Sequence, residues 1–149
     1  MTSSEKPVAI RTILVAVDGS EYSEKAVKYA CMIALPLEAE VYLLYVVPML
    51  VNATPYQDTV SDQPFLALQK VGEDILARAK KLAEEHGCLA IDLISYGEAA
   101  SRIIEIAEEK SADVIVMGSR GMSGLKRLFV GSTSDKVTRQ ARCPVLIVR

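Results

Sequence analysis

Short, unbroken apolar runs recur along the sequence, and they restrict the fold more than any other feature. Each run is five to eight residues long and rich in Val, Ile and Leu, without the polar alternation that marks a half-exposed strand. This is the pattern of strands that are buried on both faces of a parallel sheet. The five runs are Thr12–Val17, Glu40–Val47, Ala90–Ser95, Asp113–Gly118 and Pro144–Val148.

Segments with helical spacing separate these runs. In the first segment Ala26, Ala30 and Ala34 recur every fourth residue, and Ser20 stands where a helix N-cap is expected. Strands that alternate with helices predict one α/β domain over residues 1–149, an open, doubly wound, five-stranded parallel sheet with helices on both faces. The predicted helices are Ser20–Ala34, Phe65–His86, Glu98–Lys110 and, approximately, Ser132–Ala141.

Charge and hydropathy argue against two classes of partner. The chain has 17 Lys plus Arg against 19 Asp plus Glu, so a broadly basic surface for nucleic acid is not expected. The longest apolar run, Val41–Val51, is broken by Pro48 and is far shorter than the ~20 residues that span a bilayer. Three cysteines without metal-ligand spacing fit reduced core residues, and the polar start Met1–Pro7 is unlike a signal peptide. We therefore expect a soluble, cytoplasmic protein with no membrane or nucleic-acid partner.

The stretch that follows the fourth run is the richest in chemistry. Between Met117 and Ser134 it holds four glycines and three basic residues, Arg120, Lys126 and Arg127. Glycines permit positive φ and let backbone N–H groups come close to an anion, and the following helix start adds its dipole and free N–H groups. Ligands of doubly wound sheets bind at the carboxyl ends of the strands, where this stretch lies. It therefore predicts a phosphate-binding loop.

Two common phosphate loops do not fit this stretch. A Walker A motif needs a Gly-Lys pair, which the sequence lacks, and a dinucleotide fingerprint needs G-x-G-x-x-G after the first strand, where Asp18-Gly19-Ser20 stands. The spacing that fits is G-x-x-G-x9-G-[ST], formed by Gly118, Gly121, Gly131 and Ser132. Together with the opening stretch 13–20 and the closing stretch 143–148, this motif resembles the ATP-binding branch of the universal stress protein family.

The resemblance implies a sheet of order 3-2-1-4-5 and a homodimer formed through the last strand, Pro144–Val148, which is apolar and expected at a sheet edge. It also implies ATP or a related adenine nucleotide at the ends of strands 1 and 4, with Mg or Mn carried by the phosphates. Asp18 would lie near the ribose and adenine, and the backbone of Val46 near the adenine edge. The full set of implied binding residues is Ala16, Val17, Asp18, Val46, Met117, Gly118, Arg120, Gly121, Gly131, Ser132, Thr133 and Ser134.

The sequence offers little for catalysis. His86 is the only histidine and stands near a helix end, and no water-activating base is evident beside the loop. This favours a nucleotide-responsive binding module over an enzyme, and the resemblance implies that the module has a regulatory role in stress response. A slow ATP-hydrolysing enzyme, or one that transfers an adenylyl or phosphoryl group, is the alternative, and a pure interaction protein is a third. The stretch Pro48–Pro64 shows no periodicity and is predicted to be a long surface loop.

Overall fold

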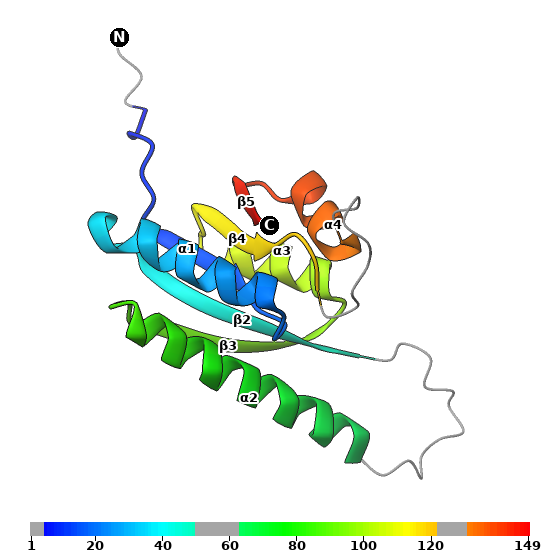
Figure 1. Cartoon of the computed structure of the whole chain (residues 1–149). Helices are drawn as coiled ribbons and strands as arrows, with labels where there is room; N and C mark the ends of the chain where they lie inside the picture. The colour runs from blue at the N-terminus through cyan, green and yellow to red at the C-terminus, as the bar shows by residue number, and fades with distance from the viewer. Residues whose placement is uncertain (1–4, 50–62, 122–130) are drawn as a thin grey trace.

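The computed structural model describes residues 5–49, 63–121 and 131–149 of the chain. Its strands form one sheet of order β3-β2-β1-β4-β5, and every neighbouring pair is parallel (Figure 1). This confirms the predicted fold class and strand order. The elements are β1 Thr12–Ala16, α1 Glu21–Leu37, β2 Glu40–Pro48, α2 Gln63–Glu85, β3 Ala90–Gly97, α3 Ala99–Glu109, β4 Val114–Gly118, α4 Ser132–Gln140 and β5 Val145–Val148.

Two hydrophobic layers, one on each face of the sheet, explain the unbroken apolar runs. Along β1, Ile13 and Val15 pack into the layer beneath α1 and α2, whereas Leu14 packs into the layer beneath α3 and α4. All three side chains are fully buried. A strand that alternates between two apolar layers needs an apolar residue at every position, and this is why β1 lacks polar alternation. The expected burial on both faces is wrong for β3, which lies at the sheet edge and exposes Ile91 and Asp92.

Several boundaries differ from the sequence prediction. Helix α1 continues past Ala34 to Leu37 and contains Pro36 in its last turn. It ends at Glu38, whose φ of 53° and backbone N–H to Ala34 O close the turn. Strand β3 runs two residues further than expected, because its end pairs with the end of β2, Pro48 opposite Gly97. Of the predicted loop, Pro48 belongs to β2 and Pro64 to α2, and residues 50–62 lie outside the described part of the chain.

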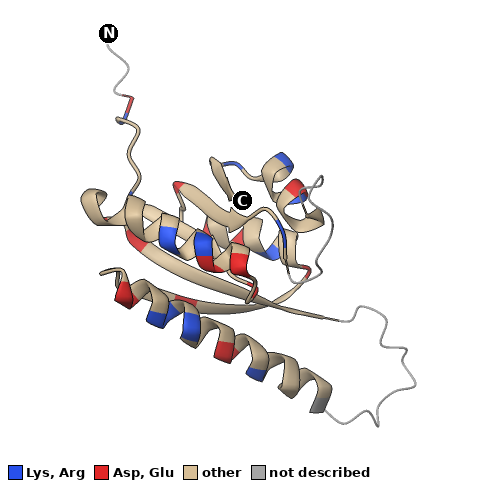
Figure 2. Cartoon of the chain, in the orientation of Figure 1, with Lys and Arg blue, Asp and Glu red and all other residues tan. Residues whose placement is uncertain are grey.

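Acidic and basic residues are interspersed along α1 and α2 (Figure 2). Some of them pair, as Lys70 does with Asp74 at 3.1 Å and Lys80 with Asp92 at 3.3 Å. Among the described helices, none has the length and apolar character needed to cross a membrane. These charged residues face solvent. In a fold of this kind, a ligand site is expected at the carboxyl ends of the strands.

Candidate functional site

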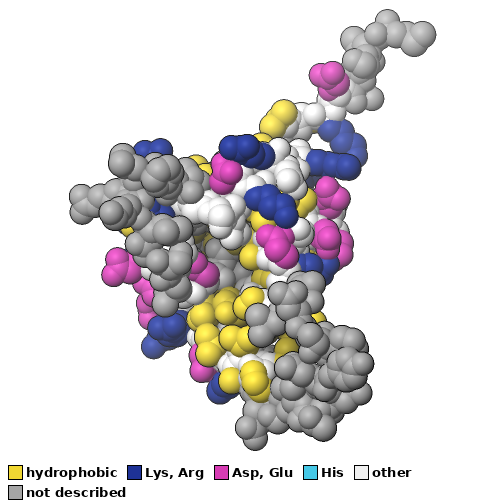
Figure 3. All heavy atoms as spheres, turned by 90° about the vertical axis from the view of Figure 1, so that its right-hand side faces the viewer, with side chains coloured by type: hydrophobic (Ala, Val, Ile, Leu, Met, Phe, Trp, Pro, Cys, Tyr) yellow, Lys and Arg dark blue, Asp and Glu magenta, His cyan; other side chains and the backbone are white. Residues whose placement is uncertain are grey.

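A cavity of about 360 Å³ opens at the carboxyl ends of the central strands. All twelve residues that the sequence analysis assigned to a nucleotide site line this cavity. Seen end-on, apolar side chains gather below the centre of this face of the molecule (Figure 3). The sequence analysis missed six lining residues, which are Ser23, Leu44, Tyr45, Pro48, Ala99 and Ile103.

The residues that line the cavity follow the order of the strands, so its two ends differ in chemistry. Val46 lies at the end of β2, Asp18 follows β1, Gly118 ends β4, and Ser132 begins α4. Because the sheet order is β2-β1-β4, these residues succeed one another across the sheet edge. The β2 end has apolar walls, to which α3 contributes Ile103, and the α4 end has hydroxyls and backbone N–H groups. The cavity therefore runs from an apolar half to a polar half, with a carboxylate between them.

Three helices begin beside this cavity, and two of them are capped by the protein's own side chains. Ser20 caps α1 by accepting a hydrogen bond from Ser23 N at 3.1 Å, as predicted. Glu98 caps α3 by accepting from Ala100 N at 3.3 Å and Ser101 N at 2.8 Å. At α4 the N-cap is Gly131, and among the described residues no side chain caps this helix. Within the described part of the chain, α4 is thus the one of the three helices whose first N–H groups have no side-chain cap and could bind an anion.

The start of α4 is fixed to the end of β4. Gly131 N donates to Ser119 O at 2.7 Å. The buried hydroxyl of Ser134 donates toward the carbonyls of Ser119 at 3.1 Å and Gly131 at 3.0 Å. Since that hydroxyl is already engaged, Ser134 offers a ligand its backbone N–H, whereas Ser132 is exposed and Thr133 half-exposed.

The glycines of the motif have a packing role in this structure. A Cβ added to Gly118 would lie 2.5 Å from Tyr22 Cβ, and one added to Gly121 would lie 2.6 Å from Asp18 Oδ2. Positive φ, which glycine permits, occurs among the described glycines at Gly19, Gly87 and Gly97 and at none of these motif positions. Gly118 is therefore required by its contact with the backbone of α1, whereas an added Cβ at Gly121 would meet only the side chain of Asp18.

Asp18 is held at the centre of the cavity by its own turn. Its Oδ1 accepts a hydrogen bond from Ser20 N at 2.9 Å, and its backbone N–H donates to Ser23 Oγ at 3.3 Å. Its other oxygen, Oδ2, faces Gly121. One carboxylate oxygen is thus used to form the turn, and the other is turned toward the loop after β4.

Tyr45 is the most informative of the missed residues. Its ring packs against α2 at Gly72, where an added Cβ would lie 2.4 Å from Tyr45 Cδ1. Burial raises the pKa of the Tyr45 hydroxyl, and the negative charge of Asp18 raises that pKa further. The side chain therefore belongs to the wall next to Asp18. A glycine in the middle of a predicted helix was the available signal, because it marks a close approach by another group.

Two other expectations concern charge and metal. Arg120 lines the cavity, whereas Lys126 and Arg127 lie outside the described residues. Within the described ranges, no group of three His, Cys, Asp or Glu residues is arranged to hold a metal ion. Arg120 is therefore a residue of the described cavity wall that could offer positive charge to an anion.

A sequence model of the universal stress protein family matches residues 9–149. The chain belongs to the universal stress protein family. Among curated relatives, universal stress protein YxiE of Bacillus subtilis is 39% identical over 144 residues, which cover 92% of this chain and 97% of YxiE. The family assignment agrees with the resemblance drawn from the glycine spacing and the flanking strands.

Solved structures of universal stress proteins share the fold. Universal stress protein UspA from Lactobacillus plantarum has a TM-score of 0.85 at 29% identity, and the match covers 96% of this chain and 100% of UspA. A universal stress protein in complex with cAMP has a TM-score of 0.73 at 26% identity, covering 95% of this chain and 98% of that one. At least one structural relative of this universal stress protein thus binds an adenine nucleotide.

Proposed function

We propose that this chain binds ATP or a related adenine nucleotide and acts as a nucleotide-responsive regulatory module in stress response. The observation that carries the proposal is the N-terminus of α4 at the polar end of the cavity, which no side chain of the described residues caps. Anions bind at such a helix start through free N–H groups and the helix dipole. The cAMP complex of a structural relative supports the choice of an adenine nucleotide.

In this proposal, the three parts of a nucleotide occupy the cavity in order. The base fits the apolar end near Val46 and Ile103, the sugar hydroxyls fit the carboxylate of Asp18, and the phosphates fit the residues from Gly131 to Thr133. A divalent metal such as Mg or Mn would arrive on the phosphates. This arrangement holds a ligand by contacts at both ends and needs no catalytic group.

Two further features belong to the proposal. Strand β5 is at the edge of the sheet, and its residues Val145, Leu146 and Ile147 are only half-buried, which suits pairing with a second copy into a homodimer. The thiols of Cys31 and Cys88 are free and buried in the core, which suits a reducing, cytoplasmic compartment.

Titration calorimetry with ATP on the wild type, Thr133→Asp and Thr133→Asn tests the binding site. An aspartate in the first turn of α4 stabilises the helix dipole, so the fold is kept while the phosphates meet a like charge. We expect Thr133→Asp to weaken ATP binding by roughly tenfold or more, and the uncharged Thr133→Asn by much less. Thermal unfolding of Thr133→Asp should occur at or above the wild-type temperature.

The same samples separate the proposal from its rivals. A wild type that takes up no ATP at millimolar concentration would disprove the nucleotide site and favour a pure interaction protein. Release of many ADP molecules per chain, at a rate abolished by Asp18→Asn, would replace the regulatory module by an ATP-hydrolysing enzyme.

A further inference from the structure

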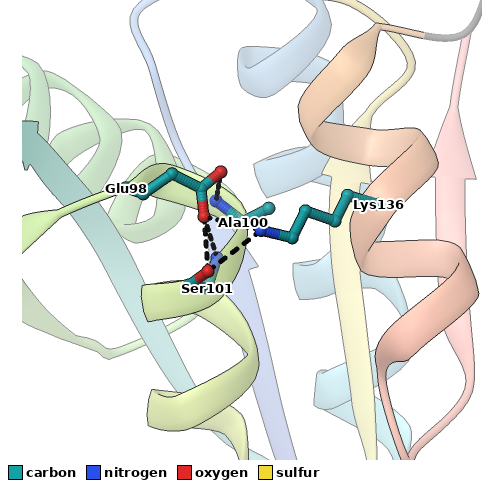
Figure 4. A network of polar contacts seen from close by, with 4 residues as sticks. All are labelled: Glu98, Ala100, Ser101 and Lys136. Atoms are coloured by element: carbon teal, nitrogen blue, oxygen red, sulfur yellow. Dashed lines mark hydrogen bonds and ion pairs between the residues drawn. The ribbon is translucent and has the colours of Figure 1, made fainter.

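A lysine of α4 is bound at the start of α3, on the rim of the cavity. Lys136 Nζ lies 3.0 Å from Glu98 Oε2 and 3.1 Å from Ser101 Oγ. Figure 4 shows this side chain extending from α4 to the first turn of α3. The next residue after Glu98 is Ala99, which lines the cavity, as does Ser132, one helical turn before Lys136. The ion pair is therefore next to the polar half of the cavity.

Glu98 does not depend on this lysine. Its carboxylate accepts hydrogen bonds from Ala100 N, from Ser101 N and from the Ser101 hydroxyl. The Ser101 hydroxyl and N–H are the larger causes that lower the pKa of Glu98 to about 2, and Lys136 is a lesser one. A carboxylate with three donors from its own helix remains paired when the ammonium leaves, so the lysine can change partner at low cost.

Lys136 is placed to reach the start of its own helix. Four residues separate it from Ser132, a rise of about 6 Å along α4, and helical side chains tilt toward the N-terminus. That separation is shorter than the Debye length of about 8 Å at physiological salt. The side chains of Lys136 and Glu98 are 38% and 54% exposed, so solvent reaches this ion pair and weakens it.

We propose that Lys136 is a phosphate-binding cation which rests on Glu98 in the free protein and moves to the phosphate chain of a bound nucleotide. Its charge then makes the affinity depend on the number of phosphates, and Glu98 moderates that affinity by competing for the ammonium. The inference rests on the proposed nucleotide site and adds to it a residue that sets ligand selectivity.

A purely mechanical role for the pair makes a different prediction. If the Glu98–Lys136 contact only ties α3 to α4, its loss would loosen the cavity and weaken every nucleotide by a similar factor. A cation that meets the phosphates acts in proportion to ligand charge, which rises from adenosine through AMP and ADP to ATP. The dependence on phosphate number therefore separates the two roles.

The experiment is calorimetry with adenosine, AMP, ADP and ATP on the wild type, Lys136→Met and Glu98→Gln. For Lys136→Met we expect ATP binding to weaken about tenfold, AMP by no more than about twofold, and adenosine to be unchanged. Glu98→Gln frees the lysine and should bind ATP at least as tightly as the wild type. Raising the salt concentration should weaken ATP binding more in the wild type than in Lys136→Met.

The Lys80–Asp92 pair supplies a matched control. It also joins a helix lysine to a carboxylate on another element, at 3.3 Å and with similar exposure, but it lies on α2 and β3 away from the cavity lining. Lys80→Met and Asp92→Asn should leave all four affinities unchanged. Urea unfolding of each variant checks that it is folded, and Lys136→Gln provides a second substitution that keeps a polar side chain.

Four results would overturn the inference. An equal loss for all four ligands in Lys136→Met, or no loss for any of them, leaves the lysine as a structural tie while the nucleotide site stands. Weaker ATP binding by Glu98→Gln would show that the carboxylate helps the lysine and does not compete for it. A wild type that binds none of the four ligands removes the proposed function together with the inference.

Discussion

At the scale of single residues, Gly118 belongs to the proposed binding motif and is also required for packing. Gly118 lies so close to Tyr22 that an added Cβ would be 2.9 Å from the Tyr22 carbonyl carbon. That atom belongs to the backbone of α1 and cannot turn aside. A substitution at Gly118 therefore disturbs the fold before it tests ligand binding. This is why the binding test above uses Thr133, where a carboxylate changes the charge and preserves the helix.

Gly72 permits a sharper test of packing. For Gly72→Ala, helix propensity predicts a gain in stability, whereas the contact with Tyr45 predicts a loss. In an open helix, alanine is favoured over glycine by about 1 kcal/mol. At this position the new Cβ would lie 2.4 Å from the Tyr45 ring. We expect Gly72→Ala to lower the free energy of unfolding by about 1–3 kcal/mol in urea titrations, through overpacking.

The double variant provides the control for Gly72. Tyr45→Leu removes the ring that the alanine would meet, so Gly72→Ala in that background should cost less or become stabilising. A more stable Gly72→Ala single variant would instead show that α2 and β2 are further apart than the structure has them.

At the scale of elements, the helix starts around the cavity differ in how far the sequence predicts them. Ser20 is a preferred N-cap residue and was identified from the sequence as the cap of α1. Glu98 was predicted as the first residue of a helix, and it is the cap, because its long side chain turns back to the N–H groups of Ala100 and Ser101. Only a comparison of the three caps shows that α4, among the described residues, has no side-chain cap.

The Glu98 cap predicts how stability depends on pH. The pKa of Glu98 is about 2 in the folded protein, below the ordinary value of 4.5. A lowered folded pKa adds stability above pH 4.5, and this contribution is lost as the pH falls from 4.5 through about 2. Urea unfolding of the wild type and Glu98→Gln should differ at pH 7 and converge toward pH 2. The difference should stay below about 1 kcal/mol, because a half-exposed carboxylate is screened by solvent.

Lys136→Met is the comparison for this measurement. Ser101 lowers the pKa of Glu98 more than Lys136 does, so this variant should retain most of the pH dependence. If the difference in the free energy of unfolding between wild type and Glu98→Gln stays unchanged down to pH 2, the charged carboxylate does not act as a cap.

At the scale of the whole molecule, the free edge of β5 determines how two copies could pair. Pro144 O accepts a hydrogen bond from Ile115 N in β4, and Val148 O accepts one from Ser119 N directly after β4. The alternate residues Val145 and Ile147 therefore direct their backbone groups away from β4. Two such edges can meet about a two-fold axis, each supplying the same strand. A dimer of this kind needs the backbone N–H of Ile147.

Proline substitutions separate pairing from folding. Ile147→Pro removes an outward N–H at an edge position where proline is tolerated, and we expect a monomer in light scattering at micromolar concentration. The wild type should show twice the chain mass of 16.2 kDa. Leu146→Pro is the contrasting variant, because its N–H faces β4 and its loss should destabilise the fold. A wild type that is monomeric would disprove the proposed dimer.

The sequence by itself determined the fold class and, through the family resemblance, the strand order and twelve of the residues that line one cavity. It could do so because burial on both faces leaves unbroken apolar runs, and because strand ends in a doubly wound sheet share one edge. Asp18 and the residues from Gly131 to Ser134 were all found in this way, and the cavity includes them.

The tertiary structure alone decided what these residues do to one another. Tyr45 joins the wall because α2 crosses it at Gly72, 27 positions further along the chain. Lys136 reaches Glu98 across 38 positions, and Ser134 closes on Ser119 across 15. Periodicity and motif spacing describe neighbours along the chain, whereas caps, close contacts and ion pairs depend on which elements the fold brings together.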